Sequence, residues 1–177
     1  PNGILFGAGS QIDVAGLVAS SLSLSSQDFL AGRMKFIGDP TMSAAVVNQG
    51  RITVGYGGRV FLVGGAVDNQ GVITAPRGDI VLAAGKSVTV AEAGAPNLQV
   101  QITAPEDRPL NLSAVTYGSR GIFSGMVRNS GTISANSAVR GADGSIMLKA
   151  SGDVSLTAGS STTANGANGG AVSVEAG

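Results

Sequence analysis

Short aliphatic runs along this chain alternate with polar residues, and one such run recurs three times after a similar turn. The copies read Val47-Asn48-Gln49-Gly50-Arg51-Ile52-Thr53, Val67-Asp68-Asn69-Gln70-Gly71-Val72-Ile73-Thr74-Ala75 and Val127-Arg128-Asn129-Ser130-Gly131-Thr132-Ile133-Ser134-Ala135. Alternation with a period of two is typical of a β-strand that buries one face. Asn48 and Asn69 lie 21 positions apart and Asn69 and Asn129 lie 60 apart. One step of about 20 residues, taken once and then three times, accounts for all three copies and indicates a stacked repeat architecture.

The strands after these turns carry aliphatic pairs that return at the same step. Ile80 and Ile146 are 66 positions apart, as are Val88 and Val154, so two independent pairs agree on one register. We therefore expect the following side chains to face inward: Ile52, Val54, Val60, Leu62, Ile73, Ile80, Leu82, Val88, Val90, Ile133, Ile146, Leu148, Val154 and Leu156. A single coil cannot bury these side chains, whereas coils stacked about 4.8 Å apart pair every strand in parallel. The pattern predicts an all-β fold, a parallel β-helix with about 20 residues per coil.

The first 46 residues predict shorter elements that lead into the coils. Strands are expected at 4–6, 10–14, 17–24 and 34–40, because aliphatic residues there are bounded by glycine, serine or proline. Ser25 is expected to cap a short helical turn that runs to Leu30 and ends near Gly32.

Residues 92–126 interrupt the repeat and hold three of the six prolines. Because proline disfavours the interior of a sheet, we predict an extra-helical β-hairpin with strands at 98–103 and 110–115 and a turn near 105–109. The 60-residue gap before Asn129 is then one lateral excursion inserted in the solenoid. We expect a single β-helical domain over 1–177, with N-terminal coils at 1–46, regular coils at 47–91, this excursion, and further coils at 127–177. The last coil is expected to contain a single strand at 171–176.

The corners of the coils are expected to be closely constrained. Asparagine tolerates the left-handed backbone region and glycine favours it, so Asn-Gln-Gly and Asn-Ser-Gly suit a sharp turn. Asparagines in successive coils can also share amide hydrogen bonds along the axis. We predict that Asn48 lies directly above Asn69, within a turn ladder made of Asn48, Gly50, Asn69, Gly71, Asn129 and Gly131.

The composition suits a narrow stack and argues against several classes of function. The 177 residues include 28 glycines and no tryptophan, which favours thin aliphatic layers over a bulky core. The charges of eleven basic and eleven acidic residues cancel. Binding to nucleic acid or to an anionic membrane requires a surplus of positive charge, so the composition predicts neither. Without cysteine or histidine, the chain lacks thiolate chemistry, the usual general base and the commonest metal ligand. The longest strongly apolar run, 60–63, is too short to insert across a bilayer.

The outward charges predict no active site. Asp79 and Arg59 occupy matching positions in successive coils and are expected to lie near each other. Some parallel β-helices cleave polysaccharides, which needs two acids at similar positions in adjacent coils, and no such pair is evident. The calcium-binding repeat Gly-Gly-x-Gly-x-Asp is also incomplete. We predict a protein without enzyme activity and without catalytic, cofactor or metal residues, and keep a carbohydrate-active β-helix enzyme as the alternative.

Three ordered stretches carry a family resemblance: Pro1-Asn2-Gly3-Ile4-Leu5-Phe6-Gly7, Val14-Ala15-Gly16-Leu17-Val18-Ala19-Ser20 and Asp28-Phe29-Leu30-Ala31-Gly32. With the coils at 47–50, 67–74 and 81–85, they resemble the secretion domain of filamentous haemagglutinin-like exoproteins. These exoproteins are the large passengers of bacterial two-partner secretion. Their secretion domain belongs to the N-terminal haemagglutination activity domain family. The resemblance implies a right-handed β-helix that the periplasmic domains of an outer-membrane transporter recognise while it is unfolded. Its secretion motif would consist of Pro1, Asn2, Gly3 and Ile4.

The resemblance also implies a location and a set of partners. We expect a monomeric segment of a secreted or cell-surface adhesin, which targets the transporter and nucleates the β-helix. The complete protein would bind a host-surface glycan or receptor. The same module in a haemolysin or a contact-dependent toxin is a further alternative, which only the sequence after Gly177 separates from an adhesin.

Overall fold

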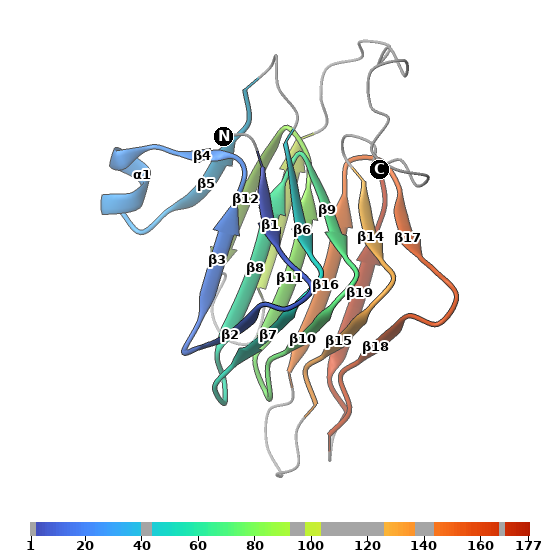
Figure 1. Ribbon diagram of the computed structural model, residues 1–177. Helices are drawn as coiled ribbons and strands as arrows, with labels where there is room; N and C mark the ends of the chain where they lie inside the picture. The colour runs from blue at the N-terminus through green and yellow to red at the C-terminus, as the bar shows by residue number, and fades with distance from the viewer. Residues whose placement is uncertain (1–2, 40–43, 93–97, 104–125, 137–143, 167–168) are drawn as a thin grey trace, which may run out of the picture.

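The computed structural model describes residues 3–39, 44–92, 98–103, 126–136, 144–166 and 169–177. Within these ranges the chain winds through five stacked coils, each with three short strands joined by corners (Figure 1). Equivalent strands of successive coils pair in parallel and form three five-stranded sheets. This architecture is the parallel β-helix that the repeat predicted.

Each sheet takes one strand from every coil. The first sheet contains β1 (Ile4–Phe6), β6 (Ala45–Asn48), β9 (Ala66–Asn69), β14 (Val127–Asn129) and β17 (Val154–Leu156). The second contains β2 (Gln11–Val14), β7 (Arg51–Val54), β10 (Val72–Thr74), β15 (Thr132–Ser134) and β18 (Ser161–Thr163). The third contains β3 (Leu17–Ser20), β8 (Arg59–Gly64), β11 (Asp79–Ala84), β16 (Ser145–Ala150) and β19 (Ala171–Glu175).

The core is a column of aliphatic side chains enclosed by the three sheets. Ile73 of the third coil lies opposite Ile52 in one neighbouring coil and Ile133 in the other, and all three are fully buried. Such stacking repeats the same inward position in every coil, as a strand period of two requires. It confirms ten of the predicted inward side chains as buried, namely Ile52, Val54, Val60, Leu62, Ile73, Ile80, Leu82, Ile133, Ile146 and Leu148. Val154 is partly buried against them, whereas Leu156 is 49% exposed, so the burial expected for Leu156 is wrong.

The long step between Asn69 and Asn129 corresponds to one coil. β9 pairs with β14, which sets Asn69 opposite Asn129, and β11 pairs with β16, which sets Ile80 opposite Ile146. Counting the gap as three steps of about 20 residues is therefore wrong. The chain leaves the solenoid after β11 and re-enters it at β14, as the predicted lateral excursion requires.

A fourth sheet lies outside the solenoid, against the third sheet. It is antiparallel, with the order β13-β12-β5-β4. Its strands are β4 (Ser23–Leu24), β5 (Met34–Ile37), β12 (Ser87–Glu92) and β13 (Leu98–Thr103). The short helix α1 (Ser26–Leu30) joins β4 to β5 and projects to one side of the molecule (Figure 1).

The expected inward position of Val88 and Val90 is wrong. They lie on β12, which pairs antiparallel with β5 and β13, and they pack on the outer face of the third sheet. The match between Val88 and Val154 fails with them, because β17 pairs with β14 in the first sheet. Alternation identifies a strand with one buried face, but the same pattern fits the inside of a coil and a sheet packed against its outside.

The predicted strand at 98–103 is present as β13, and its antiparallel partner is the preceding strand β12. The predicted strand at 110–115 and the turn at 105–109 lie outside the described residues. The strand expected at 17–24 is divided into β3 and β4. The last coil carries β18 as well as β19, so the expectation of a single strand there is wrong.

The fourth sheet explains why β8 and β11 are apolar on both faces. Phe61, Val63, Val81 and Ala83 point away from the solenoid core, yet each is at most 1% exposed. They form a second apolar cluster with Val88, Val90, Leu22 and Phe36. Strands buried on both faces read as continuous hydrophobic runs, which is the pattern of residues 60–63 and 80–84.

Candidate functional site

Three asparagine side chains form a buried column at the corner between the first and second sheets. Asn48, Asn69 and Asn129 are each 0% exposed. Nδ2 of Asn48 donates to Oδ1 of Asn69 at 2.8 Å, and Nδ2 of Asn69 donates to Oδ1 of Asn129 at 2.9 Å. The column continues from Asn129 to the hydroxyl of Thr162 at 3.2 Å. The predicted stacking of Asn48 on Asn69 is confirmed.

The same amides also hold their own turns. Oδ1 of Asn48 accepts the backbone N–H of Gly50 at 3.2 Å, and Oδ1 of Asn129 accepts that of Gly131 at 3.2 Å. Each corner is therefore tied within its coil and to the next coil by one type of side chain. A buried backbone N–H without a partner would destabilise the fold, so this arrangement accounts for asparagine at the end of the strand.

The corner glycines are required for a reason that differs from the prediction. None of Gly50, Gly71 and Gly131 has a positive φ, so a left-handed corner is not the cause. A Cβ on Gly71 would overlap the carbonyl oxygen of Gly50, and a Cβ on Gly131 would overlap that of Gly71. The close approach of one coil to the next excludes any side chain at these positions.

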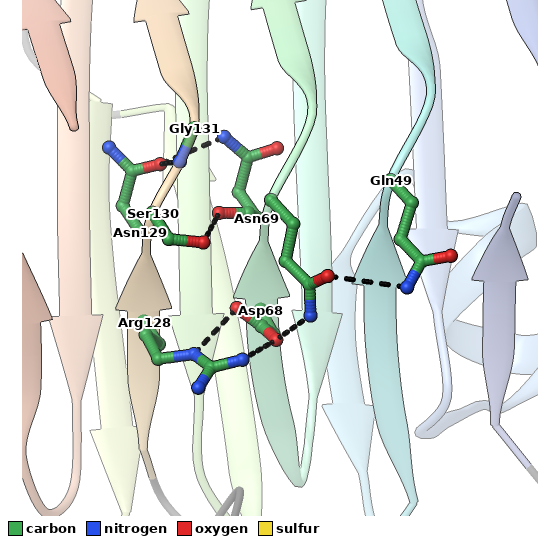
Figure 2. Close-up of polar contacts among 8 residues, drawn as sticks. Gln49, Asp68, Asn69, Arg128, Asn129, Ser130 and Gly131 are labelled. Atoms are coloured by element: carbon green, nitrogen blue, oxygen red, sulfur yellow. Dashed lines mark hydrogen bonds and ion pairs between the residues drawn. The ribbon is translucent and has the colours of Figure 1, made fainter. Parts of the chain in front are cut away.

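A row of polar side chains runs along the outside of this column (Figure 2). Asp68 is fully buried, and its carboxylate accepts hydrogen bonds from both Nε and a terminal nitrogen of Arg128. Gln70 donates to the same carboxylate at 2.6 Å and accepts from Gln49 at 3.2 Å. The hydrogen bond to Asp68 raises the pKa of the Arg128 guanidinium above its ordinary value. The row links three successive coils.

The sequence contains a signal for this ion pair, although neither residue is among the outward charges predicted to lie close together. Asp68 and Arg128 both stand between a valine and an asparagine in the repeated phrase. Equal positions in the phrase become directly opposite positions in adjacent strands. Opposite charges at such positions attract each other, so the pair could have been predicted once the 60-residue step was recognised as one coil.

A shallow groove of about 450 Å³ follows the outside of the same corner. The first coil turns through residues 7–10 between β1 and β2, whereas the second coil uses only residues 49–50 between β6 and β7. The groove contains one cation, Arg51, and no carboxylate; its lining consists of Ala8, Gly9, Ser10, Gln11, Gln49, Gly50, Arg51, Gln70, Gly71, Val72, Gly131 and Thr132. Amide and hydroxyl groups of this kind offer hydrogen bonds but no acid–base chemistry.

Two residues of the predicted secretion motif, Gly3 and Ile4, lie where the described chain enters the first coil. Pro1 and Asn2 lie outside the described residues. Gly3 has a φ of +105°, and a Cβ there would lie 2.9 Å from the carbonyl oxygen of Ala45. Ile4 begins β1, lies opposite Val46 and packs against the core. Gly3 is thus needed for a backbone conformation and for a close approach.

The stretch Asp28-Phe29-Leu30-Ala31-Gly32 lies on and after α1. The hydroxyl of Ser25 accepts the N–H of Asp28 at 3.0 Å and donates to its carboxylate at 2.7 Å, and Arg33 donates to the same carboxylate at 2.8 Å. The hydrogen bonds from Ser25 and then Arg33 lower the pKa of the Asp28 carboxyl below its ordinary value. The cap predicted at Ser25 is confirmed. Phe29 and Leu30 remain 70% and 84% exposed.

Arg59 and Asp79 lie close together, as their matching positions predicted. Nε of Arg59 is 3.5 Å from a carboxylate oxygen of Asp79, and Ser145 donates to the other oxygen at 2.5 Å. Ser145 and Arg59 occupy the positions on either side of Asp79 in the sheet, so Asp79 has no neighbouring acid there. Among the residues that the structure describes, no three histidine, cysteine or acidic side chains gather to hold a metal ion.

The stacked corners and the extra-helical sheet define a solenoid module of the parallel β-helix class. Its sequence matches the family model of the TPS secretion domain over residues 1–175, and the chain belongs to this family of two-partner secretion domains. No curated protein matches it. The crystal structure of the HMW1 secretion domain from Haemophilus influenzae is similar, with 26% identity and a TM-score of 0.67. That match covers 98% of this chain and 51% of the other, so the chain spans about half of that structure.

The family confirms the resemblance and the location predicted from the sequence. A TPS secretion domain is part of a two-partner secretion exoprotein, and its place is outside the cell or on the cell surface. The family is one of secretion domains and not of enzymes. In the described part of the chain, no helix has the length and apolar character needed to cross a membrane.

Proposed function

We propose that this chain directs an exoprotein to its outer-membrane transporter and then nucleates the β-helix of that exoprotein. The observation that carries the proposal is the family match over residues 1–175, joined to a fold built of repeated coils. The periplasmic domains of the transporter recognise the chain before it coils. The motif that begins at Pro1 and continues through Gly3 and Ile4 takes part in this recognition.

The physics of the stack supports recognition before folding. Strands of one coil form their backbone hydrogen bonds with the neighbouring coils, as β9 does with β6 and β14. A short segment therefore has few partners until the next coil arrives, and repeat proteins gain stability only through such neighbours. A chain in this condition is extended and can pass through a pore. Coiling outside the cell then makes the transfer irreversible.

We further propose that the complete exoprotein is an adhesin of the haemagglutinin type, which binds a host-surface glycan or receptor. The resemblance of the first 90 residues to filamentous haemagglutinin-like exoproteins supports this assignment. The module itself acts as a monomer and performs no catalysis. The arginine and serine that flank Asp79 support a surface role for this carboxylate rather than a catalytic one.

Export in cells that lack the cognate transporter tests the proposal. The exoprotein should disappear from the surface and the medium, while a protein exported by another route should be unaffected. Gly3→Ala should reduce export, and Gly9→Ala is the matched control because a Cβ on Gly9 would meet no atom within 4 Å. The stability of both purified variants is measured alongside, to separate export from folding. Unchanged surface export without the transporter would refute the proposal.

A further inference from the structure

The fourth sheet is assembled from two excursions that leave different coils. β4, α1 and β5 follow the first coil, whereas β12 and β13 follow the third. The second coil makes no excursion, because only Gly65 separates β8 from β9. A Cβ on the preceding Gly64 would lie 2.8 Å from the carbonyl oxygen of Ala66 and from the hydroxyl of Ser21. This tight corner leaves room for the two excursions to meet beside the second coil.

The junction between the excursions is the pairing of β5 with β12. Four residue pairs align antiparallel along this junction, from Met34 opposite Val90 to Ile37 opposite Ser87. The backbone N–H of Gly38 extends it by donating to the carbonyl of Lys86 at 2.7 Å. These contacts join segments about 50 residues apart, which loop-closure entropy opposes until both excursions are held in place.

The junction also covers an apolar surface of the solenoid. Phe36 and Val88 lie opposite each other, are 3% and 0% exposed, and share one cluster with Phe61 of the second coil and Val81 of the third. If β5 and β12 separate, the outer faces of β8 and β11 lose their cover. Opening the junction therefore costs burial in the second and third coils as well as in the excursions.

We infer that the fourth sheet is a clasp that makes the first three coils one cooperative unit, which closes only when β12 is available. Stacked repeats ordinarily couple only to their nearest neighbours. The clasp instead connects the excursion of the first coil directly to that of the third, across the second. The excursion at 23–37 therefore stays open until residues 87–92 have followed it. In the proposed export, this device delays the final folding of the first coils until the third coil is outside.

A disulfide across the clasp tests the inference in the purified chain. Lys35 and Thr89 lie opposite each other on β5 and β12 and belong to neither apolar cluster, so Lys35→Cys with Thr89→Cys allows a bridge. The native sequence has no cysteine that could compete. The matched control is Thr89→Cys with Gln101→Cys, an opposite pair that ties β12 only to β13. Comparing the oxidised and reduced forms of each variant removes the effect of the substitutions themselves.

Hydrogen exchange of backbone amides reads out the coupling, because it reports the opening of each strand separately. Oxidation of the Lys35–Thr89 variant should slow exchange at least about tenfold in both β2 of the first coil and β10 of the third. Oxidation of the control should slow exchange in β12 and β13 and leave β2 unchanged. The inference is overturned if β2 is unaffected in the first variant or slows equally in the control. The assay contains no transporter, so its failure would leave the proposed function standing.

Discussion

Replacement of Asn69 by alanine removes the middle rung of the buried amide column. The side chain is 0% exposed and forms one hydrogen bond of 2.8 Å with Asn48 and one of 2.9 Å with Asn129. A buried hydrogen bond contributes roughly 1 kcal/mol net, and a stranded buried donor costs roughly 1 kcal/mol or more. The loss of two bonds, with the Nδ2 donor of Asn48 left without its partner, should lower the free energy of unfolding by about 3 kcal/mol.

Urea unfolding followed by circular dichroism measures this loss by linear extrapolation. Gln49→Ala is the control, because Gln49 belongs to the same corner and forms a similar amide–amide bond of 3.2 Å in an exposed setting. It should change the free energy of unfolding by less than about 0.5 kcal/mol. A loss below about 1 kcal/mol for Asn69→Ala, or equal losses for both variants, would refute the reasoning from burial.

Three further predictions concern single positions. Gly71→Ala should lower the free energy of unfolding by about 3 kcal/mol, because its Cβ overlaps a backbone oxygen of the adjacent coil. Gly9→Ala, whose Cβ meets no atom within 4 Å, should have little effect in the same urea assay. Arg77 has a φ of +53°, so Arg77→Gly should be more stable than Arg77→Ala by about 1 kcal/mol; equal stabilities would contradict strain there. NMR titration of Asp28 should give a pKa below 3.8, and Ser25→Ala should raise it. The folded chain lowers the pKa of Asp28, so the ionised carboxylate stabilises the fold. This stabilisation is fully present at pH values above the ordinary pKa of 3.8 and is lost as pH falls through the lowered pKa of the folded chain.

The fold could be predicted from the sequence wherever a coil repeats its neighbour. Asn48 and Asn69 are one coil apart, and the aliphatic residues after them keep the same spacing, so the period alone fixes which positions stack. Successive coils place the same types of residue at equivalent positions. For this reason the column of asparagines and most of the inward side chains followed from the pattern.

The fourth sheet could not be predicted in the same way, because its two halves are far apart in sequence and do not repeat. Val88 and Val90 alternate as an inward pair would, and only the pairing of β12 with β5 assigns them to the outside. The apolar run at 60–63 was the available signal, since a strand covered on one face alone would alternate. The ion pair of Asp68 and Arg128 was hidden for a related reason, because its recognition depends on the length of the excursion.

The corner glycines show that a correct residue prediction can rest on the wrong cause. The turn chemistry of asparagine and glycine suggested a left-handed backbone, whereas Gly71 is required by the approach of the neighbouring coil. That approach is a tertiary contact between segments one coil apart. Propensities of single residues do not contain it.

The proposed export depends on recognition of the chain by the transporter before the chain coils. Its most direct test is the affinity of the purified chain for the isolated periplasmic domains of the cognate transporter, measured by fluorescence anisotropy. The parent chain and the Gly71→Ala variant are compared at a urea concentration that unfolds the variant and leaves the parent folded. We expect the unfolded variant to bind at least about tenfold more tightly, a difference of about 1.4 kcal/mol. Equal affinities, or tighter binding by the folded parent, would contradict this expectation.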